Sequence, residues 1–91
     1  KEDIKPSVRA AACVALAELG EPKAVDPMSE IVKNGRNLQV RAECAASLGQ
    51  LGAPEALPAL LAVHKEPDPL GGAAKWAIMQ IRKSNEKNPA R

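Results

Sequence analysis

The chain contains two similar copies of one segment. The stretch VRAAACVALAELGEPKAV, from Val8 to Val25, returns as VRAECAASLGQLGAPEAL, from Val40 to Leu57, and 8 of the 18 positions are identical at an offset of 32 residues. A period between about 20 and 50 residues is typical of repeat proteins, in which each unit packs only on its neighbours. The 91 residues of the chain leave room for two full units and part of a third. The sequence therefore predicts a stack of small units.

Each unit is predicted to be a pair of helices. Apolar residues in the first copy recur at helical spacing, which predicts one helix with a single buried stripe and then a second helix with another. Gly20 follows the first stripe and suits the left-handed position that ends a helix, and Pro22 begins the next segment. The two predicted stripes are Val8, Ala12, Ala15, Leu16 and Leu19, and then Ala24, Met28, Ile31 and Val32.

The second copy follows the same plan. Asn37 can cap its first helix, Gly52 closes that helix, and Pro54 opens the second one. Pro27 and Pro58 lie near the starts of the two second helices, where we expect an irregular first turn. The predicted stripes are Val40, Cys44, Ser47, Leu48 and Leu51, and then Ala56, Leu57, Leu60, Leu61 and Val63.

A third copy begins at Leu70 and stops after one helix. Asp68 is a suitable N-cap ahead of it, and no apolar helix follows in residues 84–91. We therefore expect an all-α chain, a right-handed α-solenoid of two full helix pairs plus one lone helix, cut from a longer array. The expected helices span residues 7–19, 22–34, 38–51, 54–65 and 69–83, and the repeats span about 7–34, 38–66 and, in part, 69–83, with a tail at 84–91.

The repeated pattern resembles the HEAT-like repeats named after phycobilisome lyases, and the artificial helical repeat proteins built from that consensus. The residues that carry the resemblance are Val8, Arg9, Leu16, Leu19, Gly20, Pro22 and Ala24, and then Val40, Arg41, Leu48, Leu51, Gly52, Pro54 and Ala56. The third copy departs from the pattern, with Gly71 in place of the arginine and Arg82 in place of the glycine. The resemblance implies that the arginines link neighbouring repeats and that the second helices line a concave face.

That face is the candidate protein-binding surface. Its exposed residues would be Lys23, Asp26, Glu30, Lys33, Glu55, Ala62 and Lys65. Their charges are mixed and no aromatic residue lies among them, whereas a nucleic-acid groove needs a basic stripe. We therefore expect a non-catalytic scaffold for protein–protein interaction that binds no nucleic acid. An ordinary solvated helix face is the alternative interpretation of the same residues.

Catalysis by this chain alone is not expected. His64 is the single histidine and takes the place of Val32, so we interpret it as structural. Cys13 and Cys44 lack metal-ligand spacing, and no metal or cofactor is expected. We expect both thiols to be buried and free, because stacked helices lie about 8–10 Å apart, a disulfide needs Cα atoms within about 7 Å, and the two cysteines are not equivalent in register. The alternative function is an accessory segment of a bilin lyase-isomerase, or of a similar enzyme, acting with a partner chain.

The lone third helix is predicted to be a contact surface. Its stripe lacks a second helix to cover it, so we expect self-association, or cover from the tail or from a partner. Trp76 aligns with Val14 and Ala46 on the outward side, where it either contacts a partner or packs beneath the tail. The candidate contacts at this end are Trp76, Ile78 and Ile81, and the other stripe residues are Ala74 and Ala77. No membrane span or signal peptide is recognisable, and we expect a cytoplasmic protein.

Overall fold

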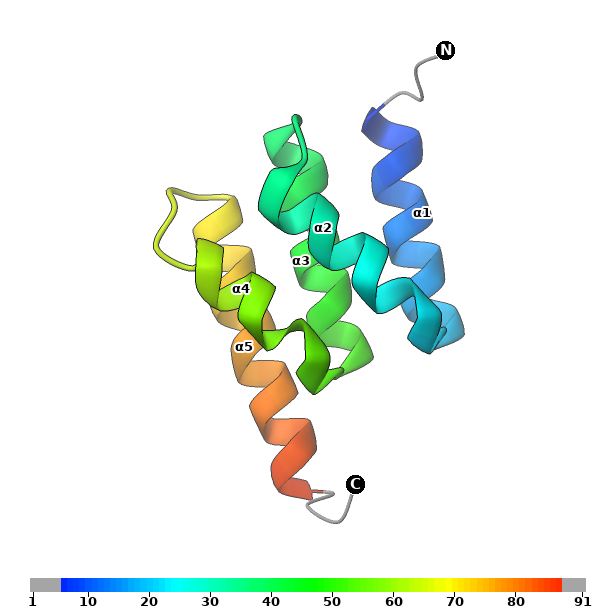
Figure 1. Ribbon diagram of the computed structural model, residues 1–91, viewed down its shortest axis with the longest axis vertical. Helices are drawn as coiled ribbons and strands as arrows, with labels where there is room; N and C mark the ends of the chain where they lie inside the picture. Colours follow the sequence, from blue (N-terminus) through cyan, green and yellow to red (C-terminus); the bar gives the residue numbers. More distant parts are fainter. Residues whose placement is uncertain (1–5, 88–91) are drawn as a thin grey trace.

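The computed structural model describes residues 6–87, and every regular secondary-structure element in this range is helical. The elements are α1 (Pro6–Leu19), the 3-10 turn η1 (Pro22–Ala24), α2 (Val25–Asn34), α3 (Leu38–Leu51), the 3-10 turn η2 (Pro54–Ala56), α4 (Leu57–Val63) and α5 (Leu70–Lys87). Figure 1 shows α1, α3 and α5 side by side in one row, with α2 and α4 in a second row. Helix α3 packs against α1 on one side and α5 on the other. The all-helical prediction is confirmed for the described residues.

The turns between helices have the predicted chemistry. Gly20 has a φ of 67° and Gly52 a φ of 71°, the left-handed region that ends a helix and that glycine adopts without steric cost. The chain then makes a 3-10 turn at Pro22 and again at Pro54 before each regular second helix begins. The predicted irregular first turn is therefore confirmed in both copies, and each unit has the same internal geometry.

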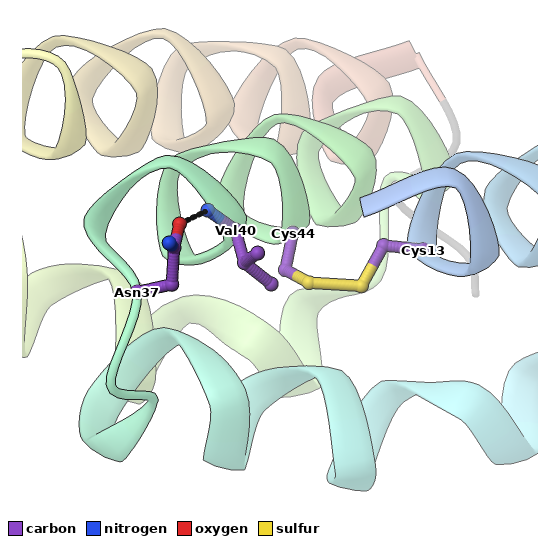
Figure 2. The surroundings of a disulfide bond; sticks show 4 residues. All are labelled: Cys13, Asn37, Val40 and Cys44. Atoms are coloured by element: carbon purple, nitrogen blue, oxygen red, sulfur yellow. Dashed lines mark hydrogen bonds between the residues drawn. A yellow bond between two sulfur atoms is a disulfide. The ribbon is translucent and has the colours of Figure 1, made fainter. Parts of the chain in front are cut away.

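The first helices of the second and third copies begin at side-chain caps. The side chain of Asn37 accepts a hydrogen bond from the backbone N–H of Val40 at 2.9 Å, as Figure 2 shows. Asp68 Oδ1 accepts one from the N–H of Gly72, also at 2.9 Å. Each cap satisfies an amide that the first turn of a helix leaves unpaired.

Helix α5 is longer than predicted. It continues to Lys87 instead of ending near residue 83, and it passes Arg82 without a turn. Arg82 stands at the position where the other two copies have the turn glycines. Because arginine does not favour the left-handed conformation and is a good helix former, the helix runs on.

The core is centred on α3, whose predicted stripe is confirmed. Val40, Cys44, Ser47 and Leu48 are buried and Leu51 is half-buried, and they pack with residues of both helix rows. Gly49 is buried on another side of α3, and a Cβ added there would lie 2.5 Å from the Cα of Ala77. A glycine at this position lets α3 and α5 approach closely, which explains a residue that otherwise disfavours a helix.

The stripe predicted for α1 is wrong except at Leu16, which is half-buried and packs against the core. Val8 is 54% exposed and Leu19 is 78% exposed, and Ala12 and Ala15 are also exposed. The equivalent residues of α3 are covered because α1 and α2 lie against them. Among the described residues, no unit precedes α1 to cover it in the same way. Helix α1 instead buries Cys13 and Ala17, on the side that faces α3.

The stripe of α5 is also different from the prediction, in the opposite sense. Ala74, Ala77, Ile78 and Ile81 are all buried, and Ile81 is 0% exposed. The sequence predicts that these residues lack a second helix to cover them. In this fold the stripe of a first helix packs on the preceding repeat, and for α5 that repeat is α3 and α4. Ile78 and Ile81 are therefore core residues and not a contact surface.

Candidate protein-interaction surfaces

The second-helix face is the outer surface of α2, α4 and the turns that precede them. In α2 the buried residues Val25, Met28 and Val32 belong to the core, and Asp26, Pro27 and Glu30 between them are exposed. In α4 the buried residues are Ala59, Leu60 and Val63. All seven predicted surface residues are exposed in consequence, namely Lys23, Asp26, Glu30, Lys33, Glu55, Ala62 and Lys65.

The 32-residue period arranges this face in columns. Lys23 and Glu55 occupy equivalent positions in the two copies, and so do Lys33 and Lys65. The first column changes sign from one repeat to the next, whereas the second column is basic in both. A surface of this kind offers a partner different charges at the two ends of the second helices.

A pocket of about 360 Å³ lies at the first of these ends, between the two turns. One wall comes from the first repeat and the other from the second. It is lined by Gly20, Pro22, Lys23, Val25 and Asp26, and by Leu51, Gly52, Ala53 and Glu55. Three of these residues are charged, and apolar residues such as Leu51 share the lining with them. The pocket has the size of a small ligand site or of a side-chain anchor for a bound protein.

Leu61 belongs to the second-helix face, contrary to the prediction. It was placed in the buried stripe of α4, but it is 45% exposed. A polar residue, Ser29, occupies the equivalent position in α2, and that difference between copies was a signal in the sequence that Leu61 need not be buried. Leu61 gives the face an apolar contact point between Ala62 and Pro58, which are also exposed.

The repeated arginines have different surroundings. Arg41 Nε donates a hydrogen bond to the carbonyl oxygen of Val32 at 2.9 Å, and Arg41 Nη2 donates one to that of Lys33 at 3.1 Å. The guanidinium thus closes the C-terminal end of α2 and ties it to α3, so the predicted link between repeats is confirmed for Arg41. Arg9 is exposed, and no hydrogen bond joins its side chain to another described residue.

Gly71 allows a close backbone contact, whereas the aligned Arg41 forms side-chain hydrogen bonds. A Cβ added to Gly71 would collide with the backbone carbonyl of Glu66, just after the end of α4. In the third copy the backbone of α5 therefore lies directly against this loop. In the second copy the side chain of Arg41 makes the contact to the end of α2. The departure from the repeat pattern reflects a closer contact between α5 and the preceding loop.

The prediction of free cysteines is wrong. Cys13 and Cys44 form a disulfide, with their Cα atoms 5.3 Å apart, and it joins α1 to α3 (Figure 2). Both residues are buried, as predicted. The prediction failed because it applied the distance between helix axes to atoms on the facing surfaces. Small residues such as Ala17 at this contact allow the Cα atoms to lie much closer than the axes.

The different register of the two cysteines is what permits the bond. Cys13 lies on the side of α1 that faces the following repeat, and Cys44 lies on the side of α3 that faces the preceding one. Equivalent positions would point in the same direction along the stack and could not meet. Disulfides are uncommon in reducing compartments. The cytoplasmic location stays a prediction, and the disulfide weighs against it.

Trp76 lies partly against α3. It is 44% exposed, and its ring edge is close enough to Gly49 that an added Cβ there would lie 3.1 Å from it. Neither of the two predicted environments describes this contact fully, since the neighbour is the preceding first helix. Trp76 and the adjacent exposed residue Met79 form a small apolar patch on α5.

His64 is half-buried and lies just after the last residue of α4. Within residues 6–87 there is no group of three or more His, Cys, Asp or Glu side chains arranged to hold a metal ion. In the same range, no helix has the length and apolar character needed to cross a membrane.

The stacked helix pairs, the left-handed glycine turns and the inter-repeat arginine define a helical repeat protein. A family model for HEAT repeats matches residues 1–82, and the chain belongs to this family. Searches of curated proteins and of solved structures returned no match. HEAT repeats generally mediate protein–protein interaction.

Proposed function

We propose that this chain is a non-catalytic module of a right-handed HEAT solenoid that binds a partner protein through its second-helix face. The observation that carries the proposal is the composition of that face. Exposed charges of both signs surround a pocket at one end, and an exposed leucine lies on α4. Specific protein interfaces commonly combine an apolar centre with a charged rim.

The division of labour within each repeat supports this assignment. The side chains shared by both copies are those that pack or turn the chain, such as Leu48 and Gly52. Several of the side chains that differ, such as Lys23 and Glu55, lie on the surface. Binding specificity can therefore vary on this face without changing the core, because exposed substitutions usually alter stability by less than about 0.5 kcal/mol.

The segment of a bilin lyase-isomerase is the weaker alternative. Its chemistry would have drawn on His64 and on the thiols of Cys13 and Cys44. The two sulfur atoms are bonded to each other and both residues are buried, so neither is available to hold a tetrapyrrole. We therefore place the function in binding and assign no catalytic residue.

Site-specific photocrosslinking tests the proposed face. A photoreactive amino acid at Ala62 should crosslink a partner protein in extracts of the source cells, and the same label at Gln50, an exposed residue of α3, should not. The double charge reversal of Lys23→Glu and Glu55→Lys should abolish the Ala62 adduct and leave the melting temperature unchanged. Equal labelling from both positions, or an adduct that survives the charge reversal, would contradict the assignment.

A further inference from the structure

The pocket between the two glycine turns has walls from two different repeats. Lys23 and Asp26 come from the first repeat, and Leu51 and Glu55 come from the second. Its volume of about 360 Å³ is at the small end of ligand sites, which range from about 300 to 1,000 Å³. A single side chain of a bound protein, or a ligand of similar size, matches this volume, whereas a whole helix does not.

The lining combines charged and apolar groups. Lys23, Asp26 and Glu55 are exposed to solvent, whereas Val25 is buried and Leu51 is half-buried. Both kinds of group border the same cavity. An occupant that matches both therefore has an apolar stem and a charged end, as the long side chains of arginine and lysine do.

The charges in the lining favour a cation. Asp26 and Glu55 provide two carboxylates, and Lys23 provides one ammonium group, so negative charge is in excess. Within residues 6–87, no hydrogen bond joins either carboxylate to another residue. Both carboxylates are therefore free to accept hydrogen bonds from an occupant. A phosphate or another anion would meet two like charges and only one opposite charge.

A metal ion does not match this donor set. Within the described residues, no three His, Cys, Asp or Glu side chains are arranged to hold one. Calcium takes six to eight oxygen ligands, and two carboxylates from opposite walls supply too few. A guanidinium fits better, because its planar group carries five N–H donors and can bind two carboxylates at the same time. The ammonium of a lysine is a compact point charge without this planar geometry.

We propose that the pocket between the two turns binds an arginine side chain of the partner protein. The stem of the arginine packs on Val25 and Leu51, and its guanidinium donates hydrogen bonds to the carboxylates of Asp26 and Glu55. The ammonium of Lys23 repels the bound guanidinium and limits the affinity. This inference rests on the proposed function, because the arginine belongs to the protein that the second-helix face binds.

The described chain forms this kind of pocket from one pair of turns. Gly20 and Gly52 both line it, and both have the left-handed conformation that ends a first helix. In the third copy Arg82 stands at the equivalent position, and α5 continues through it without a turn. We therefore expect one arginine side chain to bind per chain.

A titration of the full chain with N-acetyl-arginine methylamide tests the proposal without the partner. Backbone amide signals are followed by nuclear magnetic resonance, and we expect saturable shifts at Gly20, Gly52 and Ala53, with one site per chain. The citrulline analogue has a similar shape but no charge, and it should bind about fivefold more weakly. Added salt should weaken the binding of the arginine analogue, because the exposed charges are screened.

Substitutions in the lining give effects of opposite sign. Asp26→Asn and Glu55→Gln should each weaken binding of the arginine analogue about threefold, whereas Lys23→Gln should strengthen it about twofold. The matched control Glu18→Gln removes an exposed carboxylate of α1 outside the lining and should leave the affinity unchanged. All four residues are exposed, so the variants should melt at the temperature of the original chain.

Three outcomes would overturn the proposal. The first is equal binding of the arginine and citrulline analogues, which would make the pocket an apolar site. The second is equal binding of N-acetyl-lysine methylamide, which would mean that charge alone is recognised. The third is a shift of the same amides by inorganic phosphate and not by the arginine analogue.

The crosslinking experiment at Ala62 is independent of this titration. An adduct at Ala62 without binding of the arginine analogue would refute the role of the pocket and leave the second-helix face supported. Binding of the arginine analogue without an adduct would support the pocket chemistry and refute the proposed face.

Discussion

The first helices at the two ends of the molecule, α1 and α5, are covered to very different degrees. The stripe of α5 is packed against α3 and α4, and its outward side carries long or charged residues such as Lys75 and Met79. The corresponding stripe of α1 is open except at half-buried Leu16, and the side that faces α3 is packed. The difference shows that a repeat stack has a direction, because each first helix buries its stripe on the repeat before it.

The disulfide falls on the less covered of these two ends. Helix α1 packs mainly on α3, whereas α5 contacts both α3 and α4. The bond from Cys13 to Cys44 fixes α1 to the middle of the stack. The disulfide and a small packed surface together hold α1, whereas packing alone holds α5.

Leu48→Asp should have the largest effect. Leu48 is fully buried at the centre of α3, and a buried unpaired carboxylate costs several kcal/mol, which is comparable with the whole stability of a small domain. We expect the protein to unfold at room temperature, as measured by circular dichroism. The matched substitution Leu16→Asp, at the equivalent but half-buried position of α1, should leave a folded protein. Equal losses would show that the two copies are covered alike.

Removal of the disulfide should have the next largest effect. The cysteines are 31 residues apart in sequence, and closing a loop of this length stabilises a protein by about 3–4 kcal/mol in the chain-entropy description. The double variant Cys13→Ala and Cys44→Ala should lower the free energy of unfolding by about this amount. Hydrogen exchange should accelerate in α1 and change little in the middle of α5.

The same experiment tests the bond itself. Titration of the denatured, unreduced protein should find no thiol, and reductant should reproduce the destabilisation of the double variant. Two free thiols, or a melting temperature that does not respond to reductant, would show that the cysteines contribute to packing alone.

Truncation of an aliphatic residue should distinguish the two ends. Ile81→Ala removes a fully buried side chain from α5, and we expect the free energy of unfolding to fall by about 2–4 kcal/mol. Leu19→Ala removes an exposed side chain from the open end, and we expect a change within about 0.5 kcal/mol. Denaturant titrations of the two variants provide the comparison. A cost at Leu19 similar to that at Ile81 would mean that the exposed stripe of α1 is covered in solution.

The smallest expected difference concerns the arginines. Arg41→Ala removes two hydrogen bonds to backbone carbonyls, and it should cost about 1–2 kcal/mol. Arg9→Ala should cost almost nothing in the isolated chain, because Arg9 is exposed. Thermal melts of the two variants at low and high salt would measure both effects on stability. If Arg9→Ala proved as destabilising as Arg41→Ala, the guanidinium of Arg9 would already be bound to another part of the chain.

The sequence by itself determined the elements and their order. Periodic apolar residues predicted the helices, Gly20 and Gly52 predicted the left-handed turns, and Asn37 predicted a cap, because each of these features depends on interactions within a few residues. The recurrence of the same pattern after 32 residues added the stack of repeats. The exposed charges of the second helices followed from the same periodicity.

Only the tertiary structure decided which copy of a pattern is buried and which side chains meet. Val8 and Val40 have the same place in the repeat, but one is open and the other is covered, because cover is supplied by a neighbouring unit and not by the residue itself. The pairing of Cys13 with Cys44 likewise depends on how closely two helices approach, and on the opposite directions in which non-equivalent positions face. A periodic sequence gives every copy the same local structure, whereas burial and bonding across repeats depend on the place of each copy in the stack.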